Sequence, residues 1–222
     1  MLIYENIKRG YFIDRPNRFI AHIDLDGKKE VCHVKNTGRM GELLISGIPV
    51  YVQESSNKKR KTKFSLITFD TKRGIINVDS QVPNKLFYES NPLEFDVVLP
   101  EKQYRDSRFD FYIEKDSKSG FCEIKGVTLL GDDGIAYFPD APTKRGIKHI
   151  NHLIELKREG RLAYLVFIVK IPKVKTFSPN PKDHEFVSAL ITARNAGVEI
   201  CAYVCTVTKD SIFINEKIDV VI

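Results

Sequence analysis

Hydrophobic and polar positions follow two different patterns along this chain, one before and one after about residue 80. In the first part, short runs alternate apolar and polar residues, as strands with one buried face do. Turn residues separate these runs, for example Asp26-Gly27 and Lys72-Arg73-Gly74. The predicted strands are 18–25, 29–34, 49–54, 63–70 and 75–79. Five short strands without a long helix predict a small closed barrel of the OB or SH3 kind.

After residue 80 the pattern alternates between strands and helices. Pro83 opens a short predicted helix, and the run 162–171 is strongly β-forming, which predicts a buried central strand. The elements predicted in this part are a helix at 80–90, strands at 107–114, 120–130, 162–171 and 198–207, and helices at 143–160 and 183–197. This order indicates a mixed α/β domain. The chain is therefore expected to be α+β overall, with an OB-like barrel over residues 1–80 and an α/β domain over residues 81–222.

The charge balance favours an anionic partner. The formal net charge is +6, with a pI near 9.0, which suits DNA or RNA. The chain has no signal-peptide layout and no apolar run of roughly 20 residues, so we expect a cytoplasmic protein without a membrane partner. None of the four cysteines forms a CxxC pair, so neither a zinc ribbon nor a disulfide scaffold is supported. We expect them to be buried free thiols.

One loop of the barrel part is strongly basic. It lies between the third and fourth predicted strands and carries Lys58, Lys59, Arg60, Lys61 and Lys63. The loop is either a solvated connection or an arm that grips phosphates. A polar loop at 36–40, which includes Arg39, either closes the barrel or forms a wall of a nucleic-acid groove. Tyr51 and Phe64, beside the basic loop, could stack bases, although core positions are favoured for both.

The strands of the second part carry a pair of carboxylates. In 107–114, Phe109 and its alternate neighbours share the core face, and Asp110 lies on the other face. A hairpin turn near 116–120 would bring Asp110 next to Glu123, with Lys125 on the same face as Glu123. Two carboxylates on a strand surface can bind Mg²⁺ or Mn²⁺, and a lysine beside them can orient the attacking water. The alternative is an exposed cross-strand ion pair, which contributes little.

Further cations lie near these carboxylates. Arg108 precedes Phe109 and shares the face of Asp110. Arg145, Lys148 and His149 lie in the first turns of the helix that Thr143 is expected to cap, where free amides favour a phosphate. The alternative for His149 is a place at the seam between sheet and helix. His152 and His149 lack a third ligand at a suitable spacing, which argues against zinc.

Four segments together resemble the sugar fermentation stimulation protein A (SfsA) family. They are HVKNTGRMGELL (33–44), SRFDF (107–111), EIKGVTL (123–129) and FPDAPTKRGIKHINHL (138–153), in that order. The resemblance implies an N-terminal OB-like domain, a PD-(D/E)xK restriction-endonuclease-like domain, and binding to DNA. It places Asp110, Glu123 and Lys125 as the two carboxylates and the lysine of that signature. Phe109 stands where the signature has its proline.

Nucleases of the PD-(D/E)xK fold often use an additional acid on the helix before the sheet. Glu89, on the predicted helix, is the candidate by position, and Glu101 is the alternative. The resulting hypothesis is a metal-dependent nuclease acting on DNA or RNA. Two alternatives stay open: a non-catalytic DNA-binding regulator with a vestigial nuclease fold, and a phosphohydrolase of small nucleotides. A homodimer is compatible with the fold, although no residue pattern argues for it.

Overall fold

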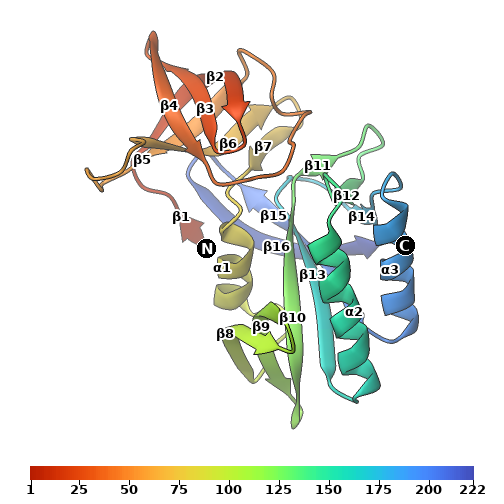
Figure 1. The fold of residues 1–222 in the computed structure, drawn as a ribbon. Coiled ribbons are helices and arrows are strands. Elements are labelled where there is room, and N and C mark those ends of the chain that lie inside the picture. The colour runs from red at the N-terminus through yellow and green to blue at the C-terminus, as the bar shows by residue number, and fades with distance from the viewer.

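The computed structural model describes all 222 residues and places a small barrel above a larger α/β domain (Figure 1). The barrel strands are β2 (Ile7–Asn17), β3 (Ile20–Leu25), β4 (Lys28–Val34), β5 (Pro49–Glu54), β6 (Phe64–Thr71) and β7 (Gly74–Asn77). The hydrogen-bonded order is β4-β3-β2-β5-β6, and β6 pairs again with β4, which closes a ring of five strands. The predicted barrel of the OB kind is thus confirmed, with β7 added outside the ring.

The central barrel strand, β2, is the element that the sequence pattern missed. It contains Pro16 and several charged residues, so it shows no clean alternation. Gly10 lies in its middle because β3 approaches closely there: a Cβ at this position would lie 2.6 Å from the main-chain oxygen of Asp24. The predicted fifth strand, 75–79, is therefore not part of the ring. Its place is taken by β2, between β3 and β5.

The second domain is built on one long mixed sheet. Its strands are β1 (Leu2–Ile3), β8 (Val97–Tyr104), β9 (Ser107–Lys115), β10 (Lys118–Val127), β11 (Leu129–Leu130), β12 (Ala136–Phe138), β13 (Leu162–Val169), β14 (Thr176–Pro179), β15 (Glu199–Val207) and β16 (Ser211–Val220). Its helices are α1 (Val82–Ser90), α2 (Lys144–Arg158) and α3 (His184–Asn195). The strand β13 runs parallel to both β10 and β15, so the predicted buried central strand is confirmed.

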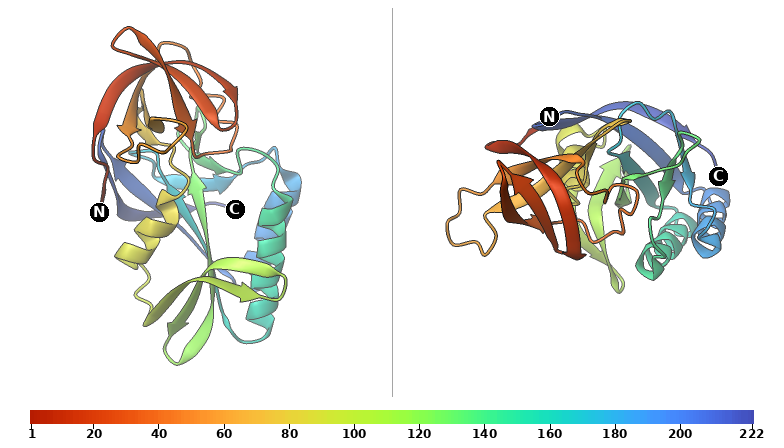
Figure 2. Two further views of the ribbon diagram at one scale, coloured as in Figure 1. Left: turned by 60° about the vertical axis from the view of Figure 1, so that its left-hand side comes forward. Right: turned by 90° about the horizontal axis from the view of Figure 1, so that it is seen from above.

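The two faces of this sheet carry separate hydrophobic layers. Phe167 of β13 packs with α2 and α3 in one cluster, which also extends into the barrel. Val166 and Ile168 point to the other face and pack with α1 in the second cluster. Figure 2 shows α2 and α3 side by side, with α1 apart from them. The strand β10 lies between α1 and α2, so its side chains are positioned by both helices.

The N-terminus belongs to the second domain rather than to the barrel. The short strand β1 pairs antiparallel with β16, with Leu2 opposite Ile212. Leu2 and Tyr4 are buried in the cluster that contains α1. The assignment of residues 1–80 to one barrel is therefore too simple, because the chain starts on the second sheet before it enters the barrel. The strand β16 was also missed, since Glu216 and Lys217 interrupt its apolar pattern.

The cysteines match a simpler expectation. All four cysteines are free and buried, and burial raises the pKa of the Cys205 thiol to about 12. None of the helices is long and apolar enough to cross a membrane.

Several polar contacts join the barrel to the second domain. The ammonium of Lys35 lies 2.6 Å from a carboxylate oxygen of Asp79. From the other side, the ammonium of Lys170 donates to the main-chain oxygen of Asp79 at 2.8 Å. The amide of Met40 donates to the carboxylate of Asp140 at 2.8 Å. Lys170 is only 1% exposed, and burial lowers its pKa to about 8.

The buried lysine predicts a specific pH dependence of stability. Between pH 8 and 10.5 the unfolded chain binds more protons than the folded chain at Lys170, so the folded state gains stability as the pH rises. In urea unfolding, the free energy of the wild type should rise relative to Lys170→Met by about 3 kcal/mol across this window. Cys205, the thiol coupled to Lys170, has a pKa of about 12 and stays protonated across this window. Ionisation of the other cysteines and of the tyrosines is common to both proteins and cancels in the difference. A flat difference would contradict a buried, destabilised ammonium.

Candidate active site

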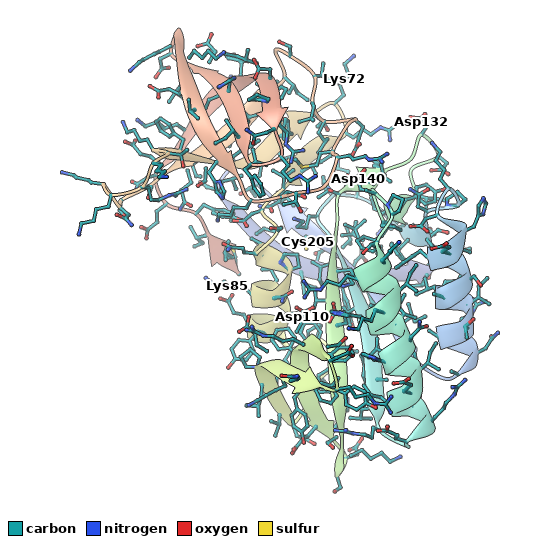
Figure 3. The ribbon with its side chains drawn as sticks, in the orientation of Figure 1. Lys72, Lys85, Asp110, Asp132, Asp140 and Cys205 are labelled. Carbon is teal, nitrogen blue, oxygen red and sulfur yellow. The ribbon has the colours of Figure 1, made fainter.

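The candidate site lies where β9 and β10 separate. The two strands pair as a hairpin, and their last pair in this direction is Phe111 with Cys122. Beyond it, the amide of Ile124 donates to a carboxylate oxygen of Asp110 at 2.8 Å instead of to a main-chain carbonyl. The Asp110 side chain therefore occupies the opening between the strands. Figure 3 labels it in the lower half of the molecule, beside β10.

A second hydrogen bond holds Asp110 from the other side. Asn84, in the first turn of α1, donates its side-chain amide to the other carboxylate oxygen of Asp110 at 2.7 Å. Burial and then the nearby charge of Glu123 raise the pKa of Asp110 above its ordinary value. Each oxygen accepts one hydrogen bond, so each keeps a lone pair for a further partner. The carboxylate is thus fixed in orientation without being saturated.

Glu123 is more deeply buried than Asp110 and has one unused oxygen. The residue is 3% exposed. Its Oε1 atom lies 2.5 Å from the ammonium of Lys125 and 2.5 Å from Nδ1 of His149. Its Oε2 atom is buried and has no hydrogen-bond partner. Burial acts to raise the pKa of Glu123, but the contacts with His149 and Lys125 outweigh it, and the pKa is lowered.

This unused oxygen fits a divalent cation. A buried carboxylate oxygen without a partner is rare in proteins, because desolvation of a charged group is costly. A cation bound by Glu123 and Asp110 would satisfy it. The structure contains no group of three or more His, Cys, Asp or Glu side chains that could hold a metal ion. Two carboxylates suit Mg²⁺ or Mn²⁺, which keep water and phosphate oxygens as their remaining ligands, and do not suit zinc.

His149 does not serve as the predicted phosphate contact. It is 3% exposed and lies between α2 and the sheet, which is the alternative position considered for it. Its ring also packs against Phe109, with ring centroids 5.4 Å apart. The sequence left both positions open for His149 and gave no signal that its partner would be Glu123. His152 instead lies 3.5 Å from the carboxylate of Asp106.

The predicted additional acid is not at the site. Glu89 lies 3.7 Å from the N-terminal amino group and 3.8 Å from Lys85. Glu101, on β8, pairs with Arg108 at the surface. The position on α1 that faces Asp110 belongs to Asn84, which precedes Glu89 by five residues and so by more than a helical turn. The expectation was wrong because the phase of this short helix relative to the sheet cannot be read from its sequence.

Some of the predicted cations are in ion pairs, and others are not. Lys148 is paired with Asp106 at 2.7 Å, and Arg108 with Glu101. Arg39 and Arg145 are exposed and have no ion-pair partner. The loop between β5 and β6 extends away from the barrel (Figure 1).

Within that loop, the cations again divide into two groups. Lys63 pairs with Glu54 at 2.9 Å, and Arg60 donates to Ser65 at 3.0 Å. The remaining loop cations, which are exposed and unpaired, are Lys58, Lys59 and Lys61. Phe64 is a core residue at 1% exposure, and Tyr51 is half-buried.

A groove of about 290 Å³ lies between the barrel and the second domain. One wall is Asn36, Thr37 and Gly38 of the barrel loop, and the other is the segment 137–141 with Thr143. Gly126, the residue after Lys125, lies in its lining. Thr143 caps α2 by accepting from the amide of Gly146 at 3.0 Å. Both domains therefore contribute to one groove, which reaches the strand of the candidate site at Gly126.

The geometry predicts which substitutions weaken metal binding. Asp110→Asn and Glu123→Gln should each reduce the affinity for Ca²⁺ or Mn²⁺ by about tenfold or more, because each replaces a ligating charge with an amide. Glu101→Gln is the matched control, since that carboxylate lies on β8 in an exposed ion pair. Isothermal titration calorimetry on the three variants measures the effect. Equal affinities in all three would show that the cation binds elsewhere.

Comparisons with known proteins match this chain to one family over nearly its full length. The family profile described as "Sugar fermentation stimulation protein RE domain" matches residues 78–211, and "SfsA N-terminal OB domain" matches residues 13–78. The sugar fermentation stimulation protein homolog of Clostridium beijerinckii is 50% identical over 225 residues, covering 99% of each chain. That of Desulfitobacterium hafniense strain Y51 is 49% identical, covering 94% of this chain and 93% of the relative.

A solved structure is similar as well. It is described as Pyrococcus furiosus SfsA in complex with Ca²⁺, and it superposes with a TM-score of 0.88 at 28% sequence identity. The match covers 100% of this chain and 98% of the other. The order of the barrel and the mixed sheet is therefore shared over the full length of both proteins.

Proposed function

The chain belongs to the sugar fermentation stimulation protein (SfsA) family, and we propose that it is a metal-dependent nuclease that hydrolyses phosphodiester bonds in DNA or RNA. The observation that carries this proposal is the buried, unpartnered Oε2 of Glu123 beside Asp110. The Ca²⁺ named for the Pyrococcus furiosus relative supports the binding of a divalent cation by this chain.

The residues of the site would have separate roles. Asp110 and Glu123 would hold Mg²⁺ or Mn²⁺, which polarises a phosphodiester and lowers the pKa of bound water. Lys125 contacts Glu123, and its side chain is 15% exposed. It would orient the attacking water or stabilise charge that develops on the phosphate. His149 and Asn84 would keep the two carboxylates in position.

The surface supports a polymeric substrate rather than a small nucleotide. The groove between the domains is walled by both of them. Arg39 follows Gly38 of its lining, and Arg145 lies two residues after Thr143 in the first turn of α2. The basic loop between β5 and β6 lies on the barrel and is not part of the site's lining. A small ligand would not need a separate cationic arm, whereas a strand of nucleic acid could contact both.

Cleavage assays test the proposal directly. Labelled single- and double-stranded DNA and RNA are incubated with Mg²⁺ or Mn²⁺ and wild type, Asp110→Ala, Lys125→Ala or Glu101→Gln. Cutting should require the metal, fall at least about 100-fold in the first two variants, and persist in Glu101→Gln. Salt-sensitive binding with no cutting by any protein would reject catalysis. That result would favour the non-catalytic DNA-binding regulator.

The basic loop predicts a change in salt dependence. Replacing Lys58, Lys59 and Lys61 by alanine should reduce the slope of log affinity against log salt by about 2 for single strands. The control replaces Lys102, Lys118 and Lys182, which are also exposed and unpaired, and so removes the same charge from the second domain. Fluorescence anisotropy with the non-cleaving Asp110→Ala background measures both slopes. Equal slopes in the two triple variants would show that only net charge matters.

A further inference from the structure

An exposed aromatic ring lies one helical turn from the candidate metal site. Tyr88 of α1 is 52% exposed. It follows Asn84 by four residues and therefore lies on the same face of the helix. Asn84 is the residue that holds the carboxylate of Asp110 at 2.7 Å. The helix thus presents an amide to the carboxylate and an aromatic ring beside it.

The sheet fixes this ring in place. Tyr88 stacks on Phe111, the residue next to Asp110, with ring centroids 6.1 Å apart and an angle of 10° between the planes. Phe111 is itself only 2% exposed and packs against Phe87, with centroids 5.4 Å apart. One face of Tyr88 is therefore covered by a rigid core ring, while much of the side chain remains exposed to solvent.

Packing against Phe111 does not by itself require a tyrosine at position 88. Its hydroxyl makes no hydrogen bond within the protein, so no polar contact requires it. A leucine would cover Phe111 as well and would expose no large ring. Lys85, three residues earlier and 57% exposed at its side chain, lies 3.8 Å from Glu89 in an ion pair and so adds no free charge here. An exposed aromatic ring held in place is the arrangement that receives an unpaired base.

We propose that Tyr88 is a stacking platform for an unpaired base. This base would lie next to the phosphate that a divalent cation held by Asp110 and Glu123 would bind. The proposal rests on the proposed nuclease function and names its substrate class: single-stranded nucleic acid or frayed ends. Bases inside a duplex have both faces covered by their neighbours and cannot offer one to Tyr88. Stacking accepts every base, so the site would show little sequence preference.

The experiment uses single-stranded oligonucleotides that carry 2-aminopurine, a base whose fluorescence is quenched by stacking. The full-length protein is loaded with Ca²⁺ for binding and with Mn²⁺ for cleavage. The variants are Tyr88→Leu and Tyr88→Met, which still cover Phe111, and Tyr88→Phe, which keeps the ring. Phe19→Leu is the matched control, because Phe19 is also 52% exposed but lies on the turn between β2 and β3 of the barrel.

We expect quenching in the wild type, Tyr88→Phe and Phe19→Leu, and its loss in Tyr88→Leu and Tyr88→Met. Affinity for single strands should fall roughly fivefold or more in the two non-aromatic variants, as expected for one lost base–aromatic stack. Affinity for duplex, affinity for Ca²⁺ and the melting temperature should be unchanged, which separates stacking from a packing defect. The use of two non-aromatic variants keeps the test valid if one of them folds poorly.

The outcomes separate this proposal from the nuclease proposal. If the non-aromatic variants bind and cut single strands as the wild type does, Tyr88 is no platform, although the nuclease function stands. If quenching depends on Tyr88 but nothing is cut, the platform stands and the nuclease function falls. If the wild type binds no oligonucleotide, both are overturned.

Discussion

Glu123 places a carboxylate inside the second domain, and the packing around it follows from that burial. An ionised carboxylate loses several kcal/mol of hydration when it is buried, unless cations and hydrogen bonds compensate. Here the compensation comes from Lys125 on the same strand and His149 on α2, both on one oxygen. The position of α2 on the sheet is therefore tied to the candidate site. The second oxygen is left free, and a divalent cation would complete the arrangement.

The separation of β9 from β10 makes room for the side chain of Asp110, the second carboxylate of the candidate site. Two paired strands would have satisfied their main-chain groups with each other and left no opening. Instead, the amide of Ile124 is satisfied by the side chain of Asp110, so the strands can part without an unpaired donor. Asn84 secures the same carboxylate from α1. The opening between β9 and β10 thus becomes a candidate site without an unpaired main-chain donor at Ile124.

The two domains are joined by contacts that Asp79 and Asp140 receive. Asp79 receives contacts from Lys35 of the barrel and from buried Lys170 of the second domain. Asp140, just before α2, accepts from the amide of Met40 in the barrel loop. These contacts fix the relative position of the domains and build the groove between them. A strand bound in that groove would touch both domains.

The sequence by itself determined the features that depend on local periodicity. Alternation within single strands placed Phe109 in the core and Asp110 on the opposite face, and the hairpin turn brought Asp110 next to β10. The same local information predicted the barrel, the central strand β13 and helices α2 and α3. Of the acid–lysine pairs with this spacing, only Glu123 and Lys125 lie inside an apolar strand, and the family resemblance matched the same two residues. These inferences needed no knowledge of how distant segments pack.

Tertiary structure decided the features that depend on distant partners. The strands β2 and β16 have charged, irregular patterns and are stabilised by neighbours from far along the chain. Asn84, rather than Glu89, faces Asp110 because the orientation of α1 is set by the buried residues beneath it. His149 found its partner in Glu123, 26 positions earlier, only because α2 lies against β10. Side-chain pairing across elements depends on their relative orientation, which packing fixes and local sequence does not encode.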